Sequence, residues 1–179
     1  MEEKKKTELK IISMADVEEE EVEWLLYPLI PFGKVTIIQG DPGEGKTTLA
    51  LQIIAKLTRG EAVRPFDEPV SVAESEEKTE LDKLPMNVLY QTAEDGLGDT
   101  IKPRLNAAGA DCSKVLVIDD KEKALTMMDS RLEEALIETG ARLVVLDPIQ
   151  GYLGADVDMH RANEIRPVMK RISTLAEKY

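Results

Sequence analysis

Gly40 to Gln52 read GDPGEGKTTLALQ, a stretch that places three glycines, a proline and a lysine between two apolar segments. Before it, KVTIIQG at residues 34–40 is a short β-branched run, which is typical of a buried strand. After it, apolar residues recur at helical spacing, with Leu49, Ile53 and Leu57 on one core-facing stripe. Because glycine and proline interrupt regular structure, the stretch predicts a strand, a tight loop and a helix in that order.

The loop has the spacing of a phosphate-binding motif, since Gly40, Gly45, Lys46 and Thr47 fit the pattern G-x-x-x-x-G-K-[ST]. Glycines let backbone N–H groups curl around a phosphate, and the N-terminus of the helix adds a partial positive charge. Lys46 is expected to reach the β- and γ-phosphates, and the Thr47 hydroxyl is expected to ligate Mg²⁺. The predicted nucleotide-binding residues are Gly40, Asp41, Pro42, Gly43, Glu44, Gly45, Lys46, Thr47 and Thr48.

Strands and helices alternate along the rest of the chain. Short apolar runs predict strands at 87–93, 114–119 and 142–147. The helix after the first of these is expected to start at Asp99 or Thr100, with Pro103 in its first turn. A capping box of Ser130 and Glu133 is expected to start the next helix, and apolar spacing at 165–175 predicts the last. The pattern predicts an α/β fold with a parallel sheet covered by helices on both faces.

Three regions of the chain differ in composition. Residues 1–23 form a charged N-terminal segment, and residues 24–179 carry the alternating pattern of the core. Within that core, residues 61–86 are acidic, contain prolines and lack an apolar period, which predicts an exposed, flexible insertion. A solvated helix at 74–84 is the alternative for part of this insertion.

Two carboxylates follow predicted strands. Asp147 ends the strand at 142–147, where it suits the aspartate that holds Mg²⁺ through water, although a helix cap before Pro148 is the alternative. Glu94 follows the strand at 87–93, from which it could orient the water that attacks the γ-phosphate. Asp95 is its rival for that role, and a solvated turn is the alternative to both. An Asn-Lys-x-Asp guanine contact is absent from the sequence, which disfavours a GTPase.

The charge balance and the cysteine content narrow the class of protein. The chain has 23 basic and 35 acidic residues and a net charge of -12, so its total charge does not indicate sequence-independent binding to nucleic acid. Cys112 is the single cysteine, which is consistent with a reducing compartment. The charged N-terminus lacks the apolar core of a signal peptide, and no apolar run is long enough to span a bilayer. A cytoplasmic protein without a membrane segment is predicted.

Three segments together resemble a known family: PLIPFGKVTIIQGDPGEGKTTLALQ, VLYQTAEDG and RLVVLDPIQGYLG. In order and spacing they are similar to the RecA-like ATPase domain of the AAA-type family that includes the hexameric plasmid helicase RepA. The resemblance covers residues 24–179 and implies ATP and Mg²⁺ as cofactors, and hydrolysis coupled to movement on single-stranded DNA by a ring of subunits. It identifies Lys46 and Thr47 with the Walker A motif, Asp147 with the Walker B aspartate and Glu94 with the catalytic glutamate. Glu94 and Lys46 are thus the expected catalytic residues.

The resemblance also implies further strands beyond the last helix, because family members have strands there that carry a sensor residue, an arginine finger and a second DNA loop. One of these strands separates the two Walker strands, so this chain is expected to be a C-terminally truncated form. Residues 34–40 would then keep an unpaired edge or pair directly with residues 142–147. The loop PIQGYLGADVDMHRAN matches the region that faces DNA, but its Asp156 and Asp158 disfavour phosphate contact. A nucleotide-binding regulatory module without turnover and a recombinase-type ATPase are the alternative functions.

Overall fold

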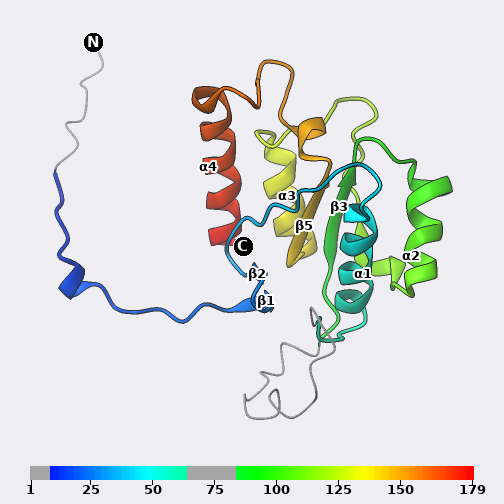
Figure 1. Ribbon diagram of the computed structural model, residues 1–179, viewed down its shortest axis with the longest axis horizontal. Helices are drawn as coiled ribbons and strands as arrows, with labels where there is room; N and C mark the ends of the chain where they lie inside the picture. Colours follow the sequence, from blue (N-terminus) through cyan, green and yellow to red (C-terminus); the bar gives the residue numbers. More distant parts are fainter. Residues whose placement is uncertain (1–8, 64–83) are drawn as a thin grey trace.

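A three-stranded parallel sheet lies at the centre of the computed structural model, which describes residues 9–63 and 84–179 (Figure 1). Its order is β4-β3-β5, with β3 at Val88–Thr92, β4 at Val115–Leu116 and β5 at Leu143–Asp147. Both neighbours run parallel to β3. The predicted strands at 87–93, 114–119 and 142–147 are confirmed, although β4 is shorter than expected, and the α/β fold class is confirmed with them.

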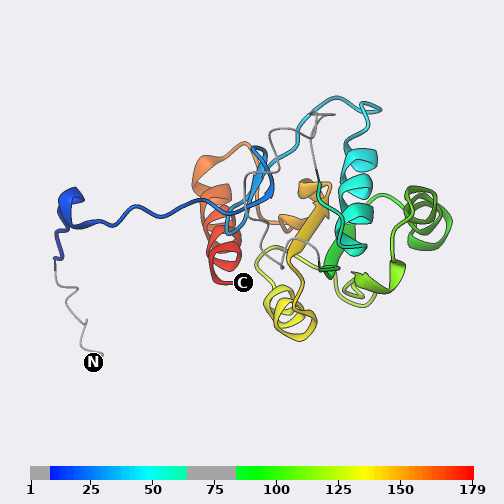
Figure 2. The same cartoon turned by 90° about the horizontal axis from the view of Figure 1, so that it is seen from below.

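Helices cover both faces of this sheet (Figure 2). On one face lie α1 (Lys46–Thr58) and α2 (Lys102–Ala108), and on the other lie α3 (Ser130–Thr139) and α4 (Ala162–Lys178). Alternation along β3 divides the core, because successive side chains of a strand point to opposite faces. Val88 and Tyr90 pack with the α1 and α2 side, whereas Leu89 packs with α3 and α4.

A small second sheet precedes the glycine-rich loop at residues 40–45. It pairs β1 (Trp24–Leu26) antiparallel with β2 (Ile30–Pro31), and Leu26 packs against Ile53 and Leu57 of α1. Short helical turns join the larger elements: η1 at Met14–Asp16, the π-helical η3 at Leu97–Ile101, η4 at Cys112–Lys114 and η5 at Ile149–Tyr152. Within the described residues, no helix combines the length and the apolar character needed to cross a membrane.

The prediction of a buried strand at residues 34–40 is wrong. The segment has irregular backbone, all of its residues are exposed, and the Ile37 side chain is 63% exposed. High β-propensity does not supply a hydrogen-bonded neighbour, and β5, at the edge of the sheet, pairs with β3 alone among the described strands. Neither arrangement expected of this segment is present, because it forms no strand and pairs with none of the described strands.

Two details of the helices also differ from expectation. Leu49 is 49% exposed, so the buried stripe of α1 begins at Leu51 and Ile53 instead. The helix around Pro103 starts earlier than Asp99 or Thr100, because η3 begins at Leu97 and continues directly into α2. Pro103 is the second residue of α2, but because η3 precedes α2 without a break, it does not lie in the first turn of the helix as the sequence predicted.

The predicted capping box of Ser130 and Glu133 is also wrong. Asp129 caps α3, since its Oδ1 accepts a hydrogen bond of 3.0 Å from the backbone N–H of Arg131. Glu133 instead accepts bonds from the Lys178 ammonium (2.8 Å) and the Tyr179 hydroxyl (2.9 Å) at the end of α4. The Glu133 side chain, which the sequence pattern assigned to the cap of α3, therefore contacts the end of α4 instead. The predicted insertion at 61–86 lies mostly outside the described residues.

Asp129→Ala is expected to lower the free energy of unfolding by about 1–2 kcal/mol at pH 7, because it removes the cap of α3. Side-chain hydrogen bonds from Arg131, and then its backbone N–H, hold the pKa of the Asp129 carboxyl well below its usual range. Its stabilisation is complete above the unfolded pKa of about 3.9 and is lost as the pH falls below that value. Urea unfolding at pH 7 and pH 3 measures both effects. Asp129→Asn, which keeps a capping oxygen, should lose only the pH-dependent part, and equal stability of all three proteins would contradict the assignment.

Candidate nucleotide-binding site

The glycine-rich loop runs from residue 40 to residue 45, immediately before the first residue of α1. Gly43 has φ of 84° and Gly45 has φ of 88°, in the left-handed region where only glycine is free of strain. Gly45 stands at the N-cap position of α1, so the start of the helix faces the loop. The backbone N–H of Asp41 donates to Glu44 Oε2 at 2.7 Å, which closes the loop on itself. Asp41, Pro42 and Glu44 are exposed, and the loop presents its backbone to solvent.

Lys46 spans this loop. Its Nζ donates to the carbonyl oxygen of Gly40 at 2.8 Å and to that of Asp41 at 2.7 Å. The side chain therefore folds back over the loop from the first turn of α1, and its positive charge lies beside the exposed backbone. A bound phosphate group placed against the loop would meet both the N-terminus of α1 and this ammonium.

Thr47 and Asp147 meet although 100 residues separate them in the chain. Thr47 Oγ1 donates to Asp147 Oδ2 at 2.7 Å, which joins the first turn of α1 to the end of β5. The parallel sheet explains the contact, because the carboxyl ends of β3 and β5 lie at the same edge as the start of α1. Asp147 is partly buried there, and its backbone oxygen accepts from Ala93 N at 3.0 Å.

Tyr90 is a third member of this cluster that the sequence did not reveal. Its ring is fully buried between β3 and the α1–α2 layer, and its hydroxyl donates to Asp147 Oδ2 at 3.2 Å. Burial raises the pKa of the Tyr90 hydroxyl, and the charge of Asp147 raises it further, so the group stays a donor. The sequence feature that could have identified Tyr90 is its place within a predicted buried strand. A buried tyrosine hydroxyl needs a hydrogen-bond partner, so a polar contact was to be expected there.

Arg104 of α2 contacts both Thr48 and Asp95. Its Nη2 donates to Thr48 Oγ1 at 2.9 Å, and its Nη1 lies 3.7 Å from Asp95 Oδ2. The guanidinium thus ties the first turn of α1 to the turn that follows β3. Sequence reasoning missed this residue, since nothing in the pattern around it indicates which helix it faces.

Glu94 follows β3 at the same edge of the sheet. It is exposed, and within the described chain no side chain or backbone group forms a hydrogen bond with its carboxylate. Ala93 N is bonded to the backbone of Asp147, which fixes the start of the turn, and Thr92 Oγ1 accepts from Asp95 N at 3.1 Å, which fixes its next residue. The structure therefore brings the predicted residues Lys46, Thr47, Asp147 and Glu94 to one edge of the sheet.

These residues fit a nucleotide with Mg²⁺ better than a metal ion alone. In residues 9–63 and 84–179, no group of three or more His, Cys, Asp or Glu side chains could hold a metal. Protein-bound Mg²⁺ in nucleotide sites needs only one or two protein oxygens, because phosphates and waters complete its octahedron. The Thr47 hydroxyl and the Asp147 carboxylate supply such oxygens beside the loop, so both would hold the ion together with the phosphates.

The chain has the fold of a P-loop NTPase domain. Its parallel sheet is covered by helices, the glycine-rich loop precedes α1, and the carboxylate of Asp147 lies at the end of β5. A family described as AAA domain matches residues 3–179, and the chain belongs to that family. None of the curated proteins compared with the chain matches it significantly. Nucleotide binding is the activity that membership of this family implies.

Proposed function

We propose that the chain binds ATP with Mg²⁺ and hydrolyses it. The contact between Thr47 Oγ1 and Asp147 Oδ2 supports this proposal most strongly. It places a hydroxyl and a carboxylate together at the start of α1, next to the glycine-rich loop. Structural hydroxyl–carboxylate pairs occur elsewhere in proteins, but here the pair lies where a metal ion between loop-bound phosphates and β5 would need its ligands.

Binding would use the loop backbone and Lys46. The backbone N–H groups of residues 43–48 would surround the phosphates, and the Lys46 ammonium would exchange its carbonyl acceptors for phosphate oxygens. Mg²⁺, when bound, neutralises charge on the phosphates as the terminal phosphoryl group leaves. Thr47 would ligate the ion directly, and Asp147 would hold it through water.

Hydrolysis would use Glu94 to orient and deprotonate the attacking water. Its carboxylate is exposed at the sheet edge, so a water molecule can reach it, whereas the neighbouring Asp95 carboxylate faces the Arg104 guanidinium. That ion pair engages the Asp95 carboxylate, whereas the Glu94 carboxylate has no partner within the described residues. Glu94 is therefore the better of the two candidates for the water-activating role.

The finer proposal is a replicative helicase of the RepA type, from a plasmid- or phage-type element, that acts as a ring on single-stranded DNA. It rests on the motif resemblance across the three quoted segments. The loop after β5 contributes little, because Arg161 lies 3.4 Å from Asp158 and 3.2 Å from Glu164, and these carboxylates offset its charge. DNA contact would therefore need other parts of the assembly.

A nucleotide-binding module without turnover is the second candidate. The exposed, unpaired backbone of residues 34–40 favours it, since this segment leads directly into the loop and no described strand holds it in place. A loop without a paired strand behind it can bind phosphates and still fail to hold them in a reactive geometry, because catalysis is sensitive to small displacements of the reacting groups.

Phosphate release from ATP, with and without single-stranded DNA, separates these functions when it is measured beside nucleotide binding. The expected result is Mg²⁺-dependent binding with turnover that DNA stimulates. Turnover that DNA leaves unchanged would support the ATPase and contradict the helicase. Binding without phosphate release would identify the binding module, and the absence of binding would contradict both proposals.

A further inference from the structure

The hydroxyl of Tyr90 makes a contact that core packing alone does not require. The Tyr90 ring is fully buried and packs with Leu51 and Ile54 of α1 and with Leu105 of α2. A phenylalanine ring would fill the same space among these apolar side chains. A buried tyrosine hydroxyl needs a hydrogen-bond partner, and the structure gives it one, Asp147 Oδ2 at 3.2 Å. The hydroxyl therefore has its structural effect on the Asp147 carboxylate.

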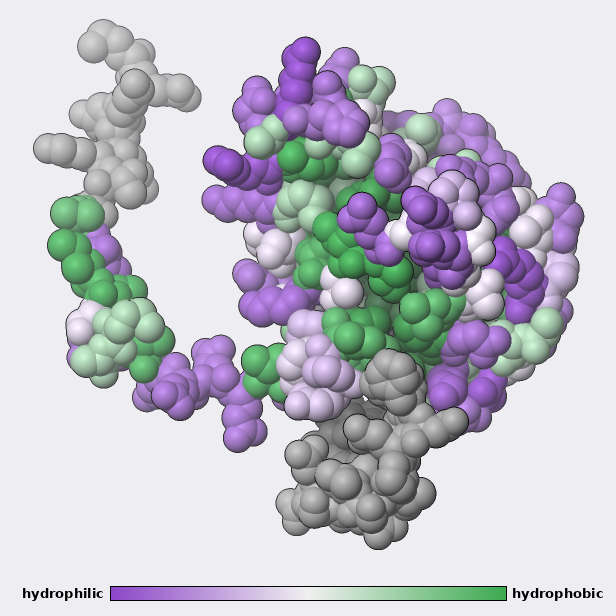
Figure 3. Space-filling model, viewed as in Figure 1, coloured by the Kyte–Doolittle hydropathy of each residue, from purple (hydrophilic) through white to green (hydrophobic). Residues whose placement is uncertain are grey.

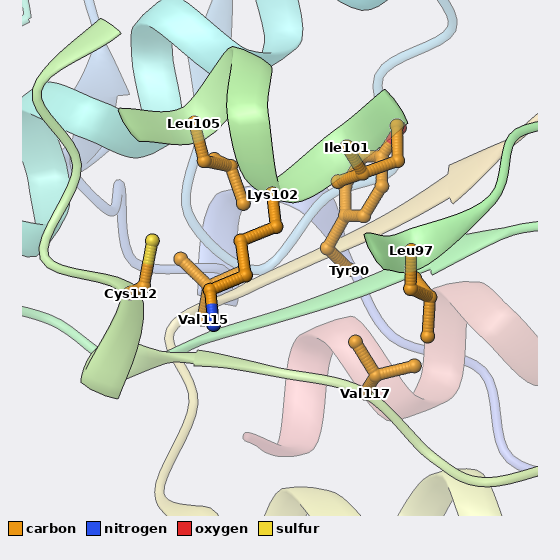
Figure 4. A pocket seen from close by; sticks show the side chains of 8 residues that line it. All are labelled: Tyr90, Leu97, Ile101, Lys102, Leu105, Cys112, Val115 and Val117. Atoms are coloured by element: carbon orange, nitrogen blue, oxygen red, sulfur yellow. The ribbon is translucent and has the colours of Figure 1, made fainter. Parts of the chain in front are cut away.

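Tyr90 lies beneath the surface formed by α2 and η3. Figure 3 shows mostly hydrophilic side chains over the end of the molecule where α2 lies. Under that layer, Tyr90 lines the inner wall of a pocket of about 210 Å³ together with Leu97 and Ile101 of η3. Figure 4 shows the Tyr90 ring beside the Ile101 side chain. Because the whole side chain is buried, solvent water does not compete with Asp147 for its hydroxyl, and Tyr90 has no surface with which to touch a nucleotide.

The parallel register of β3 and β5 explains why Tyr90 reaches Asp147. Tyr90 is paired with Val145, and Asp147 follows Val145 by two residues. Because side chains alternate along a strand, Val145 and Asp147 lie on the same face of the sheet as Tyr90. The first turn of α1 covers this face and brings Thr47 Oγ1 to the same carboxylate oxygen, Asp147 Oδ2, at 2.7 Å. Two hydroxyl groups from two different elements thus donate to one oxygen.

This arrangement divides the two oxygens of the Asp147 carboxylate. A carboxylate oxygen has about two lone-pair sites, and the hydroxyls of Thr47 and Tyr90 occupy those of Oδ2. Among residues 9–63 and 84–179, no donor forms a hydrogen bond with Oδ1, and no cationic side chain lies within ion-pair distance of the carboxylate. Both partners of Oδ2 are neutral, so the negative charge is not cancelled by a protein cation. Oδ1 and that charge are available to a metal-bound water.

We propose that Tyr90 is a positioning residue for the nucleotide site: its hydroxyl holds Asp147 Oδ2 and so keeps Oδ1 free for the water of a bound Mg²⁺. This inference rests on the proposed function and adds to it a residue that does not touch the nucleotide. Thr47 holds the same oxygen but would itself ligate the ion, whereas the packed ring of Tyr90 fixes its hydroxyl independently of the ion. Hydrogen-bond partners of metal-binding side chains typically contribute 10–100-fold to metal affinity.

Tyr90→Phe tests this role, because it removes the hydroxyl and keeps the ring in the core. The probe is ATP that carries a fluorescent methylanthraniloyl group, and its affinity is measured in EDTA and again in saturating Mg²⁺. The ratio of the two affinities measures the coupling between nucleotide and metal ion. We expect this ratio to be about 10-fold smaller in Tyr90→Phe than in the parent, while the affinity in EDTA stays unchanged.

Tyr179→Phe is the matched control. The Tyr179 hydroxyl also donates to a carboxylate, Glu133 Oε1 at 2.9 Å, but this pair joins α4 to α3 on the opposite face of the sheet. The control should keep the parental ratio. Crystals of Tyr90→Phe without nucleotide give a second readout, since the Asp147 carboxylate, then held by Thr47 alone, is expected in more than one orientation.

Three results would overturn the positioning role while leaving the nucleotide site in place. They are a parental ratio in Tyr90→Phe, an equal loss of affinity in EDTA and in Mg²⁺, which loosened packing would produce, and an equal fall of the ratio in Tyr179→Phe. A single, parental orientation of Asp147 in the Tyr90→Phe crystals would contradict it as well. A parent that does not bind the probe, or binds it equally with and without Mg²⁺, would contradict the proposed function and this inference together.

Discussion

Replacing Lys46 by alanine is expected to weaken the binding of ATP with Mg²⁺ by at least about 100-fold, equivalent to about 2.8 kcal/mol. The Lys46 ammonium already lies over the loop, bonded to the carbonyls of Gly40 and Asp41, where phosphate oxygens would replace those acceptors. Hydrogen bonds to charged groups contribute about 1.5–3 kcal/mol each, so the loss of two such bonds accounts for this effect. Isothermal titration with ATP and Mg²⁺ measures it.

Lys56→Ala is the matched control for this variant. Lys56 lies on the same helix, about 15 Å further along it from the rise of about 1.5 Å per residue. It should bind nucleotide as the parent does, and thermal unfolding of both variants checks that α1 remains intact. If Lys46→Ala binds ATP with parental affinity, the loop is not the nucleotide site.

Replacing Glu94 by glutamine is expected to lower the rate of phosphate release by about 10²–10⁴-fold while nucleotide affinity stays unchanged. Glutamine keeps the size of the side chain but cannot accept the proton of the attacking water. Because Glu94 is exposed and makes no hydrogen bond within the described residues, its replacement should leave the fold intact. Single-turnover hydrolysis beside equilibrium binding separates the chemical step from affinity.

Asp95→Asn is the comparison that tests the assignment of Glu94. This change weakens the contact with Arg104, and through it the link to Thr48, so we expect a smaller loss of turnover. A large loss in Asp95→Asn together with parental turnover in Glu94→Gln would assign the water-activating role to Asp95. Parental turnover in both variants would place that role outside this turn.

The sequence predicted those parts of the fold that depend on local pattern. The apolar runs of β3 and β5 identified both strands. The same reasoning failed at residues 34–40, because β-branched side chains favour an extended chain but do not create the neighbouring strand that pairs with it. It failed at Leu49 as well, since helical spacing defines a stripe but not which part of the stripe another element covers.

In the candidate site, too, some features follow from the sequence alone and others from the tertiary structure. Gly43 and Gly45 adopt the left-handed backbone that their residue type permits, and Lys46 follows them at fixed spacing, so the sequence by itself determined the backbone of the glycine-rich loop. Only the tertiary structure decided that Thr47 contacts Asp147, that Tyr90 donates to the same carboxylate, and that Arg104 joins Thr48 to Asp95. The physical reason is range: backbone conformation follows from neighbouring residues, whereas contacts across tens of residues follow from the order of the strands and from which helix covers which face.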